Sequence, residues 1–254
     1  MLILLSPSKT QDYAGPLTFK KYSLPRFLDD TRELVRELRK FSVGGIEKLM
    51  GVSWKIADLN RERFKNFQKT FSLKNSRQAI LAYIGHVYMD IDVENYSPKD
   101  FEFAQKHVRI LTGMYGVLRP LDLIQPYRLE FRIVLKTKRG KNLYEFWNRK
   151  VTDLVAADLR EQGDDVIINL ASEEYFQVIK PELLEAKIIQ PIFKEHRNGQ
   201  YKIFGLLAKR ARGMMTDFVI KERLSKPEEL KTFNTGGYRF RKEFSNDHEF
   251  VFVR

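Results

Sequence analysis

The sequence contains no cysteine. This absence excludes disulfide bonds, thiolate nucleophiles, zinc ribbons and cysteine-ligated iron–sulfur clusters. Histidine is scarce as well, and its four positions lie far apart, without the spacing of metal ligands: His86, His107, His196 and His248. We therefore predict no metal site and no cofactor. A chain without thiols suits a cytoplasmic protein that works under oxidising conditions.

Long apolar runs are missing too. No stretch approaches the roughly 20 residues that a membrane-spanning helix needs. The first ten residues, MLILLSPSKT, contain a short apolar run but neither the basic leader nor the small-residue cleavage site of a signal peptide. We expect no membrane partner, and we predict a buried first strand over residues 2–5.

The pattern of apolar residues predicts a single mixed domain over residues 1–254. Of these residues 43% are hydrophobic, enough for a substantial core, and no linker or repeat divides them. We predict an α/β mixed (α+β) fold with a central mixed sheet. Periodicity predicts helices over about 25–40, 98–107 and 142–162, the last being one continuous helix that places Trp147 in the protein core. Apolar runs predict strands over 108–112 and 165–170, and turn residues predict β-hairpins at 197–199 and 236–237.

Positive charge is what the sequence has in excess. The formal net charge is +12, which points to a polyanionic partner. Residues 32–77 contain twelve Lys or Arg against five Asp or Glu and so contribute +7. A solvated helix surface, with Glu33 and Glu37 facing Arg36 and Lys40, is the structural alternative. The concentration of charge favours nucleic acid.

The basic region contains a distinctive turn between two short amphipathic patterns, in the stretch GGIEKLMGVSWKIADLNRERF over residues 44–64. Gly51 can end the first helix in the left-handed conformation, and Ser53 can cap the second helix with its hydroxyl. Ala57 is small enough to let the two helices approach closely. These features predict a tight helical hairpin over about residues 43–68.

The hairpin resembles a helix–hairpin–helix module, which binds nucleic acid. Ile46, Leu49, Gly51, Val52 and Ala57 match the usual pattern, with Ser53 in place of its second glycine. Such a hairpin presents backbone N–H groups to a phosphate, and Lys48, Lys55, Arg61, Arg63 and Lys65 could flank the bound strand. An ordinary helical hairpin packed in the core would need the same apolar spacing. The pattern by itself leaves both interpretations open.

Other polar clusters lie in loops and at the ends of predicted strands, where functional sites are often found. Lys9 follows the first strand in a loop of hydroxyl residues that lacks the glycines of a P-loop. Arg119, Arg128 and Glu130 crowd the loop around 113–130, where the structural alternative is pairing of these arginines with Asp122 or Glu130. Ser172 and Glu174 follow a predicted strand, at the end where α/β proteins tend to place ligands.

A further basic cluster opens a predicted helix near Ala208. Lys209, Arg210 and Arg212 would oppose the helix dipole if the helix begins there, and a bound anion would resolve that conflict. The argument weakens if the helix begins earlier.

Five segments together resemble the YaaA family of bacterial peroxide-stress proteins: LSPSKT (5–10), RQAILAY (77–83), LTGMYGVLRPLDLIQPYRLE (111–130), VIINLASEEYF (166–176) and AKRARGMM (208–215). The resemblance implies a cytoplasmic protein that binds DNA, protects it under hydrogen peroxide stress and helps to limit intracellular free iron. It also implies a single mixed α/β domain with a helix–hairpin–helix element and a positively charged cleft.

We therefore predict a non-enzymatic binder of double-stranded DNA, including bent or distorted DNA, with a monomer as the favoured oligomeric state. The predicted DNA-binding residues combine the hairpin with the basic positions that the resemblance assigns to the cleft: Lys48, Gly51, Val52, Ser53, Lys55, Arg63, Lys9, Arg119, Arg128, Lys209, Arg210 and Arg212. The alternative is an enzyme acting on a nucleotide or nucleic acid, with Lys9, Glu130 and Glu174 as catalytic candidates.

Overall fold

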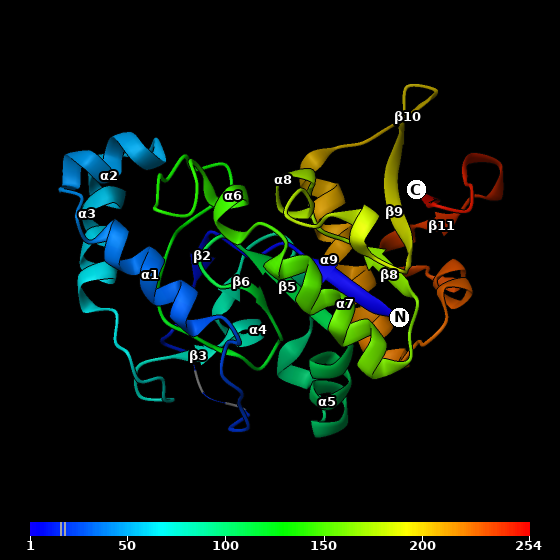
Figure 1. The fold of residues 1–254 in the computed structure, drawn as a ribbon. Helices are drawn as coiled ribbons and strands as arrows, with labels where there is room; N and C mark the ends of the chain where they lie inside the picture. Colours follow the sequence, from blue (N-terminus) through cyan, green and yellow to red (C-terminus); the bar gives the residue numbers. More distant parts are fainter. Residues whose placement is uncertain (16, 18) are drawn as a thin grey trace.

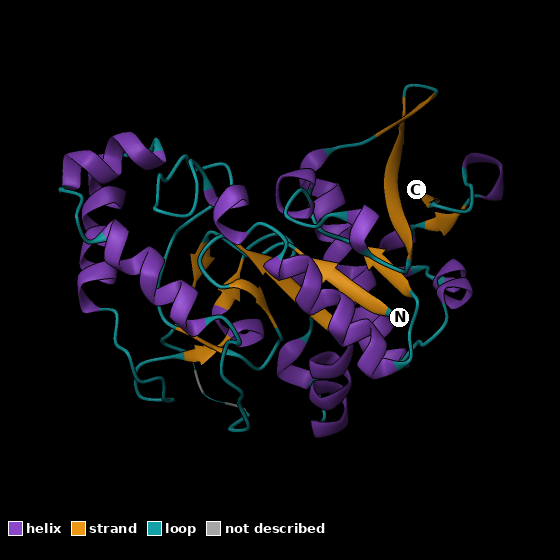
Figure 2. Ribbon diagram, in the orientation of Figure 1, coloured by secondary structure: helices purple, strands orange, loops and turns teal. Residues whose placement is uncertain are grey.

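The computed structural model describes residues 1–254 except residues 16 and 18. One sheet organises the described chain, in the order β11-β12-β9-β8-β1-β5-β6, with β10 paired to β9 (Figures 1 and 2). The four strands β12, β9, β8 and β1 run parallel with β5, while β6, β10 and β11 are antiparallel to their neighbours. The predicted mixed α/β fold with a central mixed sheet is confirmed.

The strands of this sheet, in chain order, are β1 (Leu2–Leu5), β5 (Val108–Thr112), β6 (Gly116–Leu118), β8 (Val166–Asn169), β9 (Lys187–Arg197), β10 (Gln200–Lys202), β11 (Arg239–Phe240) and β12 (Glu249–Val253). Two small pairs complete the set, β2 (Thr10–Gln11) with β4 (Tyr83–Ile84) and β3 (Arg77–Gln78) with β7 (Leu123–Ile124).

The described helices are α1 (Leu28–Leu38), α2 (Val43–Met50), α3 (Trp54–Asn66), α4 (Ala79–Ala82), α5 (Pro98–His107), α6 (Leu143–Trp147), α7 (Lys150–Gln162), α8 (Glu173–Phe176) and α9 (Gly205–Glu222). Helix α7 lies on the near side of β1 in Figure 1, whereas α9 lies on the far side, where it packs against α5. Helices α1, α2 and α3 form a group at the opposite end of the molecule from β9 and the C-terminus.

Strand β1 lies in the middle of the sheet because both of its edges are used. Its residues are almost completely buried, as four consecutive apolar side chains predict. The chain first adds β5 on one side of β1 and later adds β8 on the other side. The order of strands therefore reverses at β1, and ligands of α/β proteins bind at the carboxyl ends of strands beside such a reversal.

Several predicted elements are confirmed, but one helix is wrong. The strands predicted over 2–5, 108–112 and 165–170 are present, as is the helix over 98–107. The predicted continuous helix over 142–162 is two helices, because Asn148 takes φ 46° and ψ −121° between α6 and α7. Trp147 is fully buried, as predicted, and its indole N–H donates to the Gly113 carbonyl at 2.9 Å.

The two predicted β-hairpins have different outcomes. Strands β9 and β10 pair on either side of Asn198 and Gly199, as predicted. In the C-terminal pair, β11 is only two residues long and pairs with β12 across the segment 241–248. Gly236 and Gly237 lie before β11, so the hairpin does not turn through them.

Candidate nucleic-acid interface and the sheet-edge cluster

The helical hairpin lies where it was predicted. Helix α2 begins after Ser42, whose hydroxyl accepts a hydrogen bond from the Gly45 N–H at 3.2 Å. It ends at Gly51, which has the left-handed conformation at φ 60° and ψ 46°. Ile46 and Ala57 are fully buried and let α2 and α3 pack against each other. The local signals of capping and glycine termination therefore produced the expected turn.

The first turn of α3 differs from the expectation. Ser53 occupies the N-cap position, but its side chain makes no capping hydrogen bond. The first N–H groups of a helix have no acceptor within the helix itself. The amino end of α3 therefore presents donors that the Ser53 hydroxyl does not satisfy. Such an end attracts anions through its N–H groups and its dipole.

Two exposed lysines flank this turn. Lys48 lies in the last turn of α2, and Lys55 lies in the first turn of α3. Neither lysine forms an ion pair with a carboxylate in the described part of the chain. Their ammonium groups are therefore available for an external anion, next to the donors at the amino end of α3.

Other basic residues of the 32–77 region hold the hairpin in place. Arg39 donates to three carbonyls at the carboxyl end of α3: Phe64 (2.8 Å), Lys65 (3.0 Å) and Phe67 (2.8 Å). A cation at this end of a helix is favourable, so Arg39 fastens α1 to α3. Lys40 pairs with Glu37, as expected if this helix surface is an ordinary solvated face with paired charges. Arg39 and Lys40 therefore already have partners within the fold.

Arg63 is a partly buried cation of α3. Its guanidinium donates to the Asn60 side chain at 3.4 Å and lies near Tyr13 and Arg128. Burial lowers the pKa of Arg63, the Tyr13 side chain raises it, and the nearby Arg128 charge lowers it further. Arg63 and Arg128, which are far apart in the sequence, therefore lie close enough in the fold for their charges to interact.

Lys9, Arg128 and Glu130 form a compact group that we call the sheet-edge cluster. The Glu130 Oε1 atom accepts from Lys9 Nζ and from Arg128 Nη2, each at 3.0 Å. The Glu130 side chain is 4% exposed, and its Oε2 atom has no hydrogen-bond partner among the described residues. Burial favours the neutral form of Glu130, but Lys9 and Arg128 outweigh it and hold its pKa below the usual value. The carboxylate is therefore ionised at neutral pH.

The remaining polar candidates lie beside this cluster. The Ser172 N–H donates to the Ser6 hydroxyl at 2.9 Å, which joins the segments that follow β8 and β1. The Glu174 carboxylate accepts from the Arg132 N–H at 3.3 Å, two residues beyond Glu130. The carboxyl edge of the sheet thus brings together all three catalytic candidates from distant segments. This edge is also where the strand order reverses.

Arg119 does not join them. Strand β6 is antiparallel to β5, with Leu118 opposite Ile110, so Arg119 comes to the amino end of β5. There its guanidinium pairs with the fully buried Asp122 at 2.9 Å. Arg119 therefore lies at the opposite edge of the sheet from Lys9. The pairing of Arg119 with Asp122, which was the alternative to a functional role for Arg119, is therefore what the structure contains.

The three cations predicted near the start of α9 have different surroundings as well. Helix α9 begins at Gly205, earlier than expected, so Lys209, Arg210 and Arg212 lie beyond its first residues and the anion argument weakens. Arg210 pairs with Asp90 at 2.8 Å, and Lys209 is exposed. Arg212 lies on the side of α9 that carries the buried Ala208 and Met215, and burial lowers its pKa. Lys209 is therefore open to solvent, Arg210 is paired and Arg212 is largely buried.

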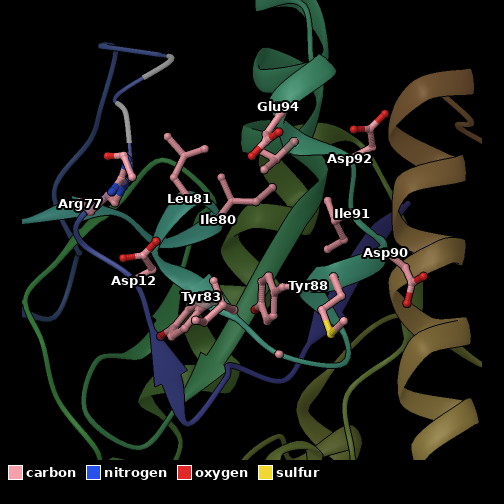
Figure 3. A pocket seen from close by; sticks show the side chains of 15 residues that line it. Asp12, Arg77, Ile80, Leu81, Tyr83, Tyr88, Asp90, Ile91, Asp92 and Glu94 are labelled. Carbon is pink, nitrogen blue, oxygen red and sulfur yellow. The ribbon is translucent and has the colours of Figure 1, made fainter.

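A hollow of about 740 Å³ lies between the segment around Asp12 and the chain from 77 to 94 (Figure 3). Tyr83 and Tyr88 line it, together with the Arg77 guanidinium. Four carboxylate side chains of the described residues line it as well: Asp12, Asp90, Asp92 and Glu94. Asp90 and Asp92 are paired with Arg210 and Lys221 of α9. This hollow is acidic and does not correspond to the predicted basic cleft.

Two properties of the described residues bear on metals and membranes. They contain no group of three or more His, Cys, Asp or Glu side chains placed to hold a metal ion. None of the described helices combines the length and hydrophobicity needed to cross a membrane.

Sequence reasoning overlooked Trp54 and a buried group of tyrosines. Trp54 is the first residue of α3 and is 59% exposed. The Tyr83 and Tyr127 hydroxyls lie 2.6 Å apart, and Tyr127 also donates to Thr112 at 3.0 Å. Burial raises the pKa of Tyr127 to about 12. An aromatic residue directly after a helix-capping serine was a visible signal for Trp54, whereas the tyrosine contacts join distant segments and had no local signal.

Comparison with known families supports the resemblance. The sequence model of a family described as peroxide stress protein YaaA matches residues 1–244. The match therefore includes the hairpin, the sheet-edge cluster and α9.

Proposed function

The chain belongs to the peroxide stress protein YaaA family, and we propose that it binds DNA through the α2–α3 hairpin. The observation that carries the proposal is the amino end of α3, which lacks a side-chain cap and lies between the exposed Lys48 and Lys55. Phosphate is the anion that such an arrangement fits, because it accepts from backbone N–H groups and is neutralised by lysine.

Contacts of this kind position a protein on DNA without reading its sequence. Gly51 and Val52 would bring the backbone close to the strand, and Arg63 would extend the positive surface toward Lys9 and Arg128. We expect binding to duplex or distorted DNA, in the cytoplasm, with a strong dependence on salt. Coverage of the backbone would protect DNA during peroxide stress. The effect on intracellular free iron that the resemblance implies stays a prediction.

Replacing Lys48 and Lys55 together with alanine should weaken DNA binding by about 10- to 100-fold at low salt, because two charge-assisted phosphate contacts disappear. The measurement is fluorescence anisotropy with a labelled 20-base-pair duplex. Neither side chain supports the fold through an ion pair in the described residues, so thermal stability should stay close to that of the unchanged protein.

A matched control removes the same charge elsewhere. Lys187 and Lys202 are exposed on β9 and β10, at the other end of the molecule from the hairpin (Figure 1). The Lys187→Ala/Lys202→Ala variant should bind within about threefold of the unchanged protein, since only distant, screened charge is lost. Equal losses in the two double variants would show that total charge, not the hairpin, governs binding.

A second candidate function rests on the sheet-edge cluster. Glu130 holds Lys9 and Arg128 at the carboxyl edge of the sheet, and its Oε2 atom is buried without a partner. We infer that an enzyme acting on a nucleotide or nucleic acid would bind phosphate through Lys9 and Arg128. The Oε2 atom would accept a hydrogen bond from a substrate hydroxyl or a water molecule, with Glu174 close by.

Glu130→Gln separates this function from simple binding. If the cluster is catalytic, the variant should lose at least 100-fold in turnover of a nucleotide or oligonucleotide while its DNA affinity stays within about threefold. The assay follows phosphate and nucleotide release from a panel of nucleoside triphosphates and short DNA strands. Absence of turnover by the unchanged protein on the whole panel would remove the enzymatic alternative.

A further inference from the structure

Trp54 is an exposed aromatic residue at the tip of the hairpin. Its side chain is 59% exposed, whereas Trp147, the other tryptophan of the chain, is fully buried. An exposed indole offers a large flat surface on which another ring can stack. The described fold leaves more than half of the Trp54 side chain uncovered.

The indole is held in place by the neighbouring helix. A Cβ atom at Gly44 would lie 3.8 Å from the Cζ3 atom of Trp54, which is ordinary van der Waals contact. Gly44 lies in the first turn of α2, so the ring extends from the start of α3 across the start of α2. One edge of the ring therefore lies beside the backbone of α2. The rest of its surface remains open to solvent.

The charges around the indole suit a nucleic acid strand. Lys55 is the next residue along α3, and Lys48 lies one turn beyond Gly44 on α2, which places it on the same side of that helix. Glu47 and Asp58 are also nearby, yet the surrounding segment 32–77 carries a net charge of +7. An exposed aromatic ring among lysines is the combination that single-strand-binding proteins use to stack bases while holding phosphates.

We propose that Trp54 stacks on an unpaired base and that the hairpin therefore prefers DNA with unstacked bases, such as single strands and bulges. This inference rests on the proposed DNA binding and names the form of DNA recognised. The phosphates of a perfect duplex can bind the lysines and the α3 N–H groups. Its bases are already stacked on one another, so they are not available to Trp54. Unpaired bases add the aromatic contact, which is independent of sequence because every base has a flat π surface.

The test compares a 20-base-pair duplex, the same duplex with a three-nucleotide bulge, and one of its single strands, all at the same salt concentration. The unchanged protein should bind the bulged and single-stranded DNA more tightly than the duplex. Trp54→Ala should lose about 5- to 100-fold in affinity for those two and change duplex affinity by less than about twofold. Trp54→Phe should retain part of the preference.

Intrinsic fluorescence provides a direct readout in the full chain. Trp147 is buried, so quenching by bound DNA reports on Trp54, and we expect quenching by bulged and single-stranded DNA but little by duplex. Leu59→Ala is the control, because Leu59 is a 50% exposed apolar residue on the same helix. That variant should keep both the preference and the quenching.

The outcomes separate the inference from the proposed function. Equal binding of the three DNAs by the unchanged protein, or an unchanged preference in Trp54→Ala, would overturn the role of Trp54 and leave hairpin binding intact. Failure of the unchanged protein to bind any of them would overturn both. A change in sedimentation of Trp54→Ala without a change in DNA preference would assign the ring to self-association and overturn the inference.

Discussion

Replacing Asp158 with alanine is expected to destabilise the protein by about 3–5 kcal/mol, because it leaves the buried Arg109 and the partly buried Arg26 without their counter-ion. Asp158 lies on α7, and its Oδ1 and Oδ2 atoms each accept at 2.5 Å, from Arg26 Nη1 and Arg109 Nε. The Arg109 side chain is 5% exposed and the Asp158 side chain 4%. The loss of this carboxylate would loosen α7 from β5.

Equilibrium unfolding in urea measures this effect. The control is Asp153→Ala, which removes a carboxylate from the same helix but from an exposed pair with Arg149. Exposed pairs of this kind contribute about 0.5 kcal/mol, so the control should lose little stability. Similar losses in the two variants would contradict a special role for the buried network.

The same network should make part of the stability depend on pH. Burial alone would raise the pKa of Asp158, but Arg26 and Arg109 outweigh it and hold that pKa below its usual value. Because the folded-state pKa lies below the unfolded value of about 3.9, this contribution is complete above that pH and is lost as the pH falls through the folded-state pKa. Asp158→Ala should therefore unfold with a shallower dependence on pH below about pH 4.

Gly213→Ala should destabilise the protein by about 3 kcal/mol or prevent it from folding, because no space exists for a side chain there. A Cβ atom at this position would lie 1.9 Å from the carbonyl oxygen of Val87. The Val87 oxygen belongs to the backbone and the position of a Cβ atom is fixed by the backbone of residue 213, so the clash cannot be relieved by a rotamer change. Helix α9 would have to move away from the segment that carries Asp90, the partner of Arg210.

Gly205→Ala is the matched control on the same helix. Gly205 is the first residue of α9, and a Cβ atom there would meet no described atom within 4 Å. Alanine has the higher helix propensity, so this variant should be as stable as the unchanged protein or slightly more stable, as thermal unfolding would show. If Gly213→Ala unfolds at the same temperature as Gly205→Ala, the close approach of α9 to Val87 is wrong.

The elements that could be predicted from the sequence are those with local signals. The strand over 2–5, the helix over 98–107 and the turn at Gly51 depend on neighbouring residues, and they are confirmed. The helix break at Asn148 could not be predicted, because the apolar stripe continues on both sides of it. Ser53 was placed correctly at the start of α3, but its hydroxyl orientation depends on contacts that spacing does not encode.

The candidate site was predicted only in part, for a similar reason. Lys9 and Glu130 were both named as candidates, but the sequence did not show that their side chains meet, as they do in the sheet-edge cluster. Arg119 is drawn to the opposite edge of the sheet by the antiparallel pairing of β5 and β6, which becomes visible only when the sheet is assembled. The ion-pair partners of α9 could not be predicted either, because Arg210 pairs with a carboxylate that is 120 residues away in the chain.

The central claim is that the α2–α3 hairpin holds DNA by its phosphates, and the salt dependence of duplex binding tests it most directly. Each phosphate contact contributes about −0.9 to the slope of log affinity against log salt concentration. Lys48→Ala/Lys55→Ala should therefore reduce the magnitude of that slope by about 2, whereas Lys187→Ala/Lys202→Ala should leave it unchanged. An identical slope for the hairpin variant and the unchanged protein would contradict the account.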